Sequence, residues 1–274
     1  MSLNRMTRRG LVVASALLAT AGAVTSADAR DFPPFASVSE GYEVVNSTAD
    51  DATTMLRLFK RDKDGQLLAE LPRGFERKRY FIGMTVAAGD QWAGLQGGDQ
   101  LVYWRRYDDR LALIAPNLSY RSSGDRESRA ATDMTFTDRV LLEVPIVTMG
   151  PGGGPVIDLD RLLLGNAGSF FGRQAAGINP RLAKIKKAKA FPRNIEIALE
   201  APVSSAGGTL RTFHYSISEI PGNTGYKPRK ADQRIGYFTT TYIDLGKYNN
   251  ETKYQRYIIR WMLEKADPKL SMSP

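Results

Sequence analysis

The chain has 274 residues and a formal net charge of +9, with one histidine and no cysteine. This length suits one large domain or two small ones. The lack of cysteine excludes a disulfide scaffold, cysteine-ligated zinc, iron–sulfur clusters and thiol nucleophiles. The positive charge favours acidic partners such as anionic lipid, polysaccharide or nucleic acid.

Residues 1–29 have the three parts of a secretory signal peptide. A basic start precedes the alanine-rich apolar run Leu11–Val24, and Ala27-Asp28-Ala29 is an A-x-A cleavage signature. We therefore predict a mature chain that begins near Arg30, is exported to the periplasm or outside the cell, and keeps no transmembrane span. The run is short for a membrane span, so an uncleaved anchor is the less favoured alternative. The pair Arg8-Arg9 adds the twin-arginine route as an alternative to the Sec route.

The first part of the mature chain predicts one hairpin. Residues 31–50 are polar, and we expect them to be irregular. Residues 53–61 alternate between apolar and polar side chains, as a half-buried strand does, and residues 66–71 form the partner strand. Asp62-Lys63-Asp64-Gly65 lies between them, and an Asp-Gly pair tolerates the positive φ that tight hairpin turns require.

The stretch 73–116 is the centre of the predicted sheet. Its apolar residues recur with a period of two, which predicts three antiparallel strands at 79–86, 101–107 and 110–115. In the second strand, Tyr103 faces one side of the sheet, whereas Val102 and Trp104 face the other. Turn residues separate the strands at Ala87–Asp90, Gly97–Asp99 and Asp108–Asp109.

Three further segments precede the middle of the chain. Residues 122–135 are polar and read as a solvated loop; serines and carboxylates occur there, but no histidine lies nearby to act as a base. Residues 136–147 predict a strand. Because Pro145 has no backbone N–H to donate, we expect this strand to lie at an edge of the sheet or to contain a bulge. Residues 149–155, MGPGGGP, lack the spacing of a phosphate-binding loop and predict a hairpin connection.

A small helical insertion is predicted near residues 158–190. Asp158-Leu159-Asp160 can cap a short helix, and Asn179-Pro180 can start another over residues 181–190. This second helix would carry a basic surface for an anionic partner: Arg181, Lys184, Lys186, Lys187, Lys189 and Arg193. Because no aromatic stacking platform accompanies these residues, we expect no nucleic acid. A solvated face, or docking of an acidic neighbouring domain, is favoured.

Residues 194–201 and 210–220 alternate cleanly and predict another hairpin. His214, in its second strand, is the only histidine. A zinc site needs about three protein ligands, so the other ligands would have to be carboxylates. A Ser–His–Asp triad stays open as an alternative, although no G-x-S-x-G motif supports it. A structural role is favoured.

The last predicted strands are at 234–245 and 255–264. Together the elements predict a mainly β (α+β) fold, with an antiparallel sheet or sandwich of about ten strands and the helical insertion near 158–190. Residues 30–274 would form a single domain after the signal peptide.

Several stretches spread over most of the mature chain carry a family resemblance. They are LFKRDKDGQLLAELPRG at 58–74, LVYWRRYDDRLALIAP at 101–116, FTDRVLLEVPI at 136–146, NPRLAKIKKAKAFPRN at 179–194, HYSISEIPGNTGYKPRKADQRIGYFTT at 214–240 and RWMLEKADPKL at 260–270. They resemble the uncharacterised N-terminal domain of bacterial secreted zinc-dependent metalloproteases of the metzincin type. In that family the catalytic H-E-x-x-H-x-x-G-x-x-H part follows these stretches. With one histidine, this sequence matches none of the zinc ligands.

The resemblance implies a non-catalytic N-terminal module that supports or shields a peptidase domain of the same or a neighbouring chain, with the present sequence truncated before it or lacking it. We expect no catalytic residue, metal or cofactor in this chain, zinc belonging to the missing domain, and no peptidase activity from it alone. One alternative is a free-standing envelope module that binds anionic glycan, lipid or protein through its basic surface. A third hypothesis is a hydrolase with its own carboxylate site.

Overall fold

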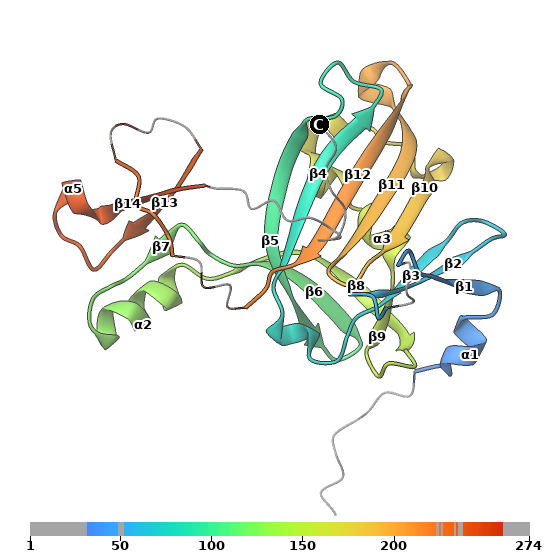
Figure 1. Cartoon of the computed structure of the whole chain (residues 1–274), viewed down its shortest axis with the longest axis horizontal. Coiled ribbons are helices and arrows are strands. Elements are labelled where there is room, and N and C mark those ends of the chain that lie inside the picture. Colours follow the sequence, from blue (N-terminus) through green and yellow to red (C-terminus); the bar gives the residue numbers. More distant parts are fainter. Residues whose placement is uncertain are drawn as a thin grey trace, which may run out of the picture. The chain divides into compact units, whose positions relative to one another are not determined.

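The computed structural model describes residues 32–48, 52–222, 225, 227–232, 234 and 238–259. The predicted signal peptide lies outside these residues. The described residues form a large sheet of eleven strands, a small sheet of three strands and a few short helices (Figure 1). The predicted mainly β class is therefore confirmed. None of the described helices has the length and apolar character needed to cross a membrane.

Every pairing in the large sheet is antiparallel. Its strands follow one another in the order β1 (Tyr42–Val45), β2 (Arg57–Arg61), β3 (Leu67–Glu70), β9 (Pro155–Asp158), β8 (Arg139–Met149), β6 (Arg110–Ala115), β5 (Gln96–Tyr107), β4 (Tyr80–Ala88), β12 (Thr209–Glu219), β11 (Asn194–Val203) and β10 (Lys184–Ala190). The two edges approach each other after β1, where the backbone nitrogen of Ser47 donates to the carbonyl of Ala190 at 3.0 Å. The sheet therefore curves until it is nearly closed.

The predicted hairpins are present in the large sheet. Gly65 has a φ of +75° in the β2–β3 turn, and Asp108 has a φ of +49° in the β5–β6 turn, where Tyr107 pairs with Arg110. The alternation in β5 is also confirmed. Val102 and Trp104 are buried in the main core, whereas Tyr103 lies on the opposite face, which we call the outer face, with Ala112 and Ile114.

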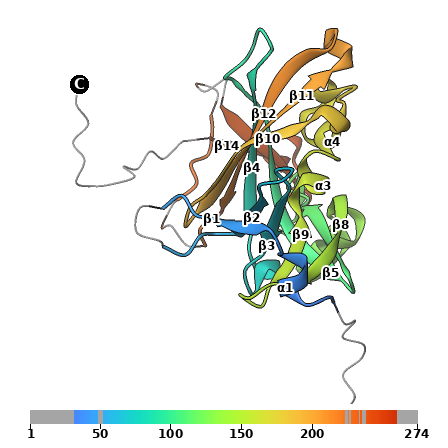
Figure 2. The ribbon, with the colours of Figure 1, turned by 90° about the vertical axis from the view of Figure 1, so that its right-hand side faces the viewer.

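Short helices pack on the inner face of the sheet (Figure 2). They are α3 (Leu159–Leu163), α4 (Ala167–Phe171) and the 3₁₀ helix η2 (Gly172–Ala175), whereas the following 3₁₀ helix η3 (Pro180–Leu182) has no buried residue. Asp158 caps α3 as predicted, because its side chain accepts from the backbone nitrogen of Arg161. The Phe171 ring lies 4.7 Å from the ring of Phe213 in β12, so the helical insertion completes the core.

The predicted helix over residues 181–190 is wrong, because residues 184–190 form strand β10. Lysine and alanine favour helix by only tenths of a kcal/mol per residue, whereas pairing with β11 satisfies the backbone and buries Ala190. A register shift between Ile185 and Lys187 obscured the alternation of this strand. The helical insertion therefore ends at Leu182.

Two segments predicted to be irregular contain regular structure. Residues 31–50 include helix α1 (Phe35–Val38) and strand β1. Residues 122–135, predicted to be a loop, include helix α2 (Arg126–Thr135), which begins where the Asp125 side chain accepts from the backbone nitrogen of Ser128 at 2.8 Å. This is N-terminal capping, which stabilises a helix by about 1 kcal/mol.

Two predictions about β5 and β8 are corrected by their pairing. Residues 97–99 are not a turn but part of β5, where Gly98 pairs with Met84. Strand β8 is not at an edge, because β6 and β9 flank it. Pro145 pairs with Arg110 at the end of β6, and the pairing with β9 begins at Ile146 and shifts register before Thr148. The predicted edge position is therefore wrong, and the register shift lies after Pro145 rather than at it.

The small sheet has the order β14 (Tyr254–Ile258), β13 (Thr239–Asp244), β7 (Tyr120–Arg121), with α5 (Asn250–Lys253) between β13 and β14. We call residues 117–138 and 238–259 the small unit. Buried Asp244 accepts from the backbone nitrogens of Ser123 and Gly246 at 2.8 and 3.0 Å, which joins its two segments. The predicted strands at 234–245 and 255–264 are found as β13 and β14; residues 260–264 lie outside the described ranges.

Two remaining 3₁₀ helices are η1 (Phe75–Arg77), between β3 and β4, and η4 (Ser204–Ala206), between β11 and β12. The hairpin predicted at 194–220 is confirmed, since β11 and β12 pair from Asn194 with Ser218 to Val203 with Thr209.

Candidate functional site

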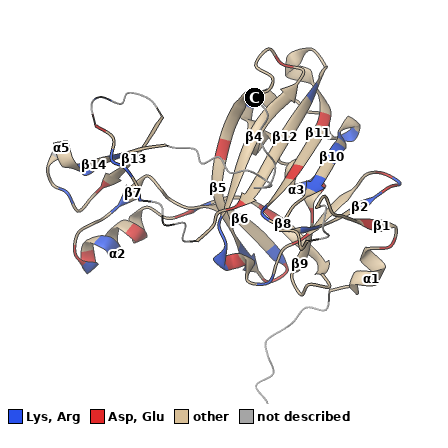
Figure 3. Cartoon of the chain, in the orientation of Figure 1, with Lys and Arg blue, Asp and Glu red and all other residues tan. Residues whose placement is uncertain are grey.

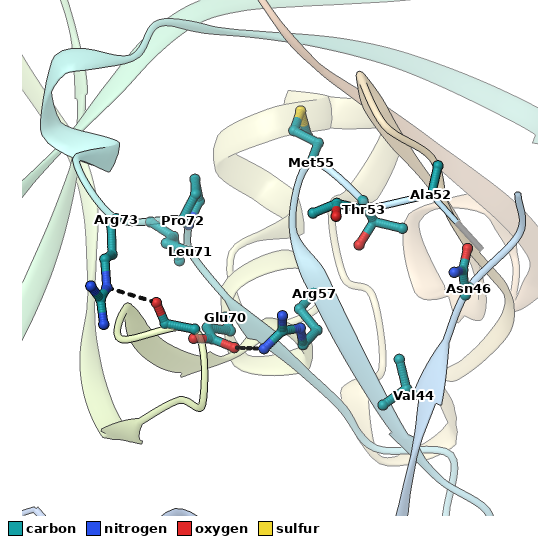
Figure 4. Close-up of a pocket in the computed structure, with 12 residues that line it drawn as sticks. Val44, Asn46, Ala52, Thr53, Met55, Arg57, Glu70, Leu71, Pro72 and Arg73 are labelled. Carbon is teal, nitrogen blue, oxygen red and sulfur yellow. Dashed lines mark hydrogen bonds and ion pairs between the residues drawn. The ribbon is translucent and has the colours of Figure 1, made fainter. Parts of the chain in front are cut away.

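A pocket of about 420 Å³ opens beside the first strands of the large sheet (Figure 4). Its walls come from the end of β1, the segment leading into β2, the end of β3 and the turn between β8 and β9. The lining residues are Val44, Asn46, Ala52, Thr53, Thr54, Met55, Arg57, Glu70, Leu71, Pro72, Arg73 and Gly152. This volume falls within the range of small-molecule sites in proteins.

Glu70 is the buried acid of this pocket, with 3% of its surface exposed. Its Oε2 lies 3.2 Å from Nη1 of Arg57 on the paired strand β2, and its Oε1 accepts from the backbone nitrogen of Gly154 at 3.3 Å. A carboxylate in a dry site is stable only when it is paired and hydrogen-bonded, and these partners meet that need.

The glycine-rich turn between β8 and β9 closes over Glu70. A Cβ atom on Gly150 would lie 2.3 Å from Cδ of Glu70, and one on Gly152 would lie 2.7 Å from its Oε1. A Cβ atom on Gly154 would lie 1.7 Å from the carbonyl oxygen of Leu71. The predicted hairpin connection is confirmed, since Met149 pairs with Pro155. The sequence did not reveal that these glycines make room for a buried carboxylate.

Arg73 contributes the second guanidinium group of the pocket. Its Nε donates to the carbonyl of Gly152 at 2.9 Å, and its two terminal nitrogens donate to no other residue of the described ranges. Figure 4 shows Arg57 and Arg73 on either side of Glu70. Such a pair of planar donor groups is suited to binding an anion rather than to proton transfer, because arginine keeps its proton.

The six basic residues predicted to share a helix face are distributed differently (Figure 3). Lys184, Lys187 and Lys189 lie on the edge strand β10, and Lys186 stands at its register shift with Nζ 3.0 Å from Oε2 of Glu200. Arg181 lies in η3, and Arg193 lies in the connection between β10 and β11. The lysines are thus brought together on a strand, with the two arginines beyond its ends. Lysines on an edge strand also hinder unwanted strand pairing.

His214 lies half-buried on the outer face of β12. Its Nε2 is 2.6 Å from Oε2 of Glu196, whose other oxygen accepts from Ser216 Oγ and Asn194 Nδ2 at 2.7 Å each. Ser216 therefore bonds to the carboxylate and not to the imidazole, which is not the arrangement of a serine nucleophile and its base. Within the described ranges, no three His, Cys, Asp or Glu side chains are grouped to hold a metal ion.

The small unit carries an unusual number of exposed large apolar side chains. Tyr248 is 96% exposed and Met134 is 77% exposed. The full set in this unit is Leu118, Met134, Phe238, Leu245, Tyr248, Tyr254 and Ile259. Single exposed apolar residues are ordinary, whereas several within 44 residues of sequence make this unit the part of the described chain richest in them. Sequence reasoning missed this feature, because strand alternation does not say which face is covered.

Comparison with models of protein families gives a match. The model of a family described as "Domain of unknown function (DUF5117)" matches residues 94–266, which is more than half of the chain. The matched segment includes the six basic residues, His214 and most of the small unit; Gly152 is the one pocket residue inside it. Neither the curated proteins nor the solved structures gave a match to the chain.

Proposed function

The chain belongs to the DUF5117 family, and we propose that it is the non-catalytic N-terminal module of an exported zinc-dependent metalloprotease-like protein. The module packs against the peptidase domain of the same or a neighbouring chain, and supports or shields it. Zinc and the catalytic residues belong to that domain.

The observation that carries this proposal is the exposed apolar surface of the small unit. Tyr248, Met134 and Tyr254 are among the side chains whose apolar surface faces water. Removing such surface from water is favourable by about 25 cal/mol for each Å². A docked domain would cover that surface. The resemblance of the chain to metalloprotease N-terminal domains supplies the identity of the docked domain.

The sequence also supports a binding role over peptidase chemistry. A metzincin-type site takes two histidines one helical turn apart, with a glutamate between them. The whole sequence has one histidine, and His214 is already bound to Glu196. The chemistry is therefore assigned to another domain.

Association with a metzincin-type peptidase domain, encoded in the same or an adjacent reading frame, tests the proposal. We expect the purified chain to bind that domain, and Tyr248→Ser combined with Met134→Ser to weaken binding by about tenfold or more. Leu182→Ser is the matched control, because Leu182 is 61% exposed but lies in η3, outside the small unit. No association, or equal loss in the control, would contradict the proposal.

A second candidate function is a free-standing envelope module that binds an anionic surface through β10. Lys184, Lys187 and Lys189 favour it, because they make no ion pair with another described residue. Binding to anionic vesicles or polysaccharide should then fall steeply with salt. Lys187→Gln should weaken it more than Lys63→Gln on the exposed β2–β3 turn; equal effects would contradict this candidate.

A further inference from the structure

The pocket beside β1 has polar lining groups that can donate hydrogen bonds and have no acceptor assigned. Arg57 uses one of its nitrogens on Glu70, and Arg73 uses only Nε. The amide oxygen of Asn46 accepts from Thr48, which leaves its Nδ2 atom to donate. The carboxylate of Glu70 is buried and already has two partners, whereas the Arg57 side chain is 41% exposed and Arg73 is exposed. Water can satisfy these donors in the empty pocket, and a ligand with acceptor oxygens can replace that water.

The charge balance of the pocket sets the charge of that ligand. Among the described lining residues, Arg57 and Arg73 are positive and Glu70 is negative. Arg57 and Glu70 neutralise each other, so one positive charge remains, carried by Arg73. One excess charge suits a monoanion, whereas a phosphate dianion would leave negative charge uncompensated beside Glu70.

Apolar side chains form one part of the lining, beside the polar residues Asn46, Thr53 and Thr54. Val44, Met55, Leu71 and Pro72 form the walls next to the two arginines. An apolar wall beside a charged group recognises a ligand that has both parts, because each part of the ligand then leaves water for a matching surface.

We propose that this pocket binds a small carboxylate with an apolar body. The carboxylate group of the ligand accepts hydrogen bonds from Arg73 and from the guanidinium nitrogens of Arg57 that do not bond to Glu70. The apolar body of the ligand lies against Val44, Met55 and Leu71. The ligand is a small molecule of a size that 420 Å³ admits. This site is independent of the proposed packing against a peptidase domain, since the pocket residues lie outside the small unit.

Calorimetric titration of the full chain with N-acetylleucine tests the proposal. We expect saturable binding, and binding about tenfold weaker for N-acetylleucinamide, which has the same shape and no charge. Inorganic phosphate is the third probe, and it should bind more weakly than N-acetylleucine. The carboxylate assignment is overturned if the amide or the phosphate binds as tightly as the acid, or if no probe saturates up to about 10 mM.

Arg73→Gln is the decisive variant, because Arg73 is exposed and makes only one hydrogen bond within the described residues. It should weaken binding of N-acetylleucine about tenfold and leave the folded structure intact. Arg181→Gln removes the same charge outside the pocket and should change nothing. Arg57→Gln is made together with Glu70→Gln, so that no buried charge is left alone, and should also weaken binding. Equal affinities for Arg73→Gln and Arg181→Gln would overturn the proposal.

Discussion

The hydroxyl of Tyr103 donates to the carboxylate of Asp138 at 2.6 Å, which links the outer face of β5 to the end of the small unit. Asp138 also accepts from the backbone nitrogen of Asn117 at 2.9 Å, and the guanidinium of Arg79 lies 4.2 Å from the Tyr103 ring centre. Burial, and then the bond to Asp138, raise the pKa of Tyr103. Burial acts to raise the pKa of Asp138, but the bonds from Tyr103 and Asn117, together with the charges of Arg79 and Arg105, outweigh it, so the pKa of Asp138 is lowered.

Tyr103→Phe should therefore lower the free energy of unfolding by about 1–2 kcal/mol, because one hydrogen bond to a charged group is lost while the ring stays. Urea denaturation measures the change. Tyr248→Phe is the control, since the Tyr248 ring is almost fully exposed. Equal midpoints for the two variants would show that the link does not contribute to stability.

Gly65→Val should destabilise the β2–β3 hairpin by about 1 kcal/mol or more, because a β-branched residue is strained at a φ of +75°. No atom lies within 4 Å of the position of a Cβ, so the backbone conformation alone is responsible. Gly65→Asn, which tolerates this conformation, should cost less. Thermal melting of both variants compares them, and equal melting temperatures would contradict the assignment.

Gly154→Ala should cost more than 3 kcal/mol or prevent folding, since its Cβ would lie 1.7 Å from the Leu71 carbonyl oxygen. Gly168→Ala in α4 is the matched control, because the space around its Cβ is open and alanine favours helix. The yield of soluble protein and the melting temperature distinguish them. A Gly154→Ala chain as stable as the control would mean that Gly154 does not lie against the Leu71 carbonyl.

Asp160 should make the fold less stable as pH rises toward neutrality. Burial, and then the nearby charges of Asp158 and Asp64, raise the pKa of Asp160 to about 7, although the backbone nitrogen of Leu67 donates to it. The folded chain thus binds this proton more tightly than the unfolded chain, whose pKa is about 4. The stabilisation is complete below about pH 4 and is lost as pH rises through 7.

Asp160→Asn should remove this dependence and raise the free energy of unfolding at pH 8 by roughly 2 to 4 kcal/mol. Urea denaturation between pH 4 and pH 8 measures it. Asp62→Asn on the exposed β2–β3 turn is the control for the change in charge. A wild-type stability that does not fall between pH 4 and pH 8 would refute this account of Asp160.

The purified chain should bind no stoichiometric zinc, and His214→Ala should leave any background peptidase signal unchanged. Catalytic zinc takes about three protein ligands and a water, and His214 is bound to Glu196. Metal analysis after gel filtration, combined with a casein cleavage assay, is the measurement. One tightly held zinc per chain, with chelator-sensitive cleavage that His214→Ala abolishes, would reverse the assignment.

The fold could be predicted in the places where local signals decide it. The Asp64-Gly65 turn and the alternation of Val102, Tyr103 and Trp104 act within a few residues, so the sequence contains them directly. Strand β10 could not be predicted this way, because its pairing with β11 outweighs the helix propensity of its lysines. Helix α2 had a local signal in Asp125, a favoured N-cap residue, whose side chain accepts from the backbone nitrogen of Ser128.

The pocket could not be predicted from the sequence. Arg57 and Glu70 meet through the pairing of β2 with β3, and Gly152 joins them because β3 pairs with β9, far along the chain. No local pattern records these pairings. The sequence does show the lysines of β10 as a basic set. Their position on an edge strand, and the ion pair of Lys186 with Glu200, follow from the pairing of β10 with β11, which the local sequence pattern does not record.

The hydrogen bond between Ser47 and Ala190 can form only after most of the chain has been synthesised. These residues are 143 positions apart, and β3 has to wait for β9 before it gains its second neighbour. An emerging chain can form the β2–β3 hairpin early, but its open side stays without a partner until much later residues leave the ribosome. Topologies with such distant contacts fold slowly, in the range of milliseconds to seconds. Strand β4 waits longer still, because its second neighbour β12 begins only at Thr209. Among the strands that end with two neighbours, the nascent chain would therefore present an unpaired edge for longest at β4, where we expect holding chaperones to bind.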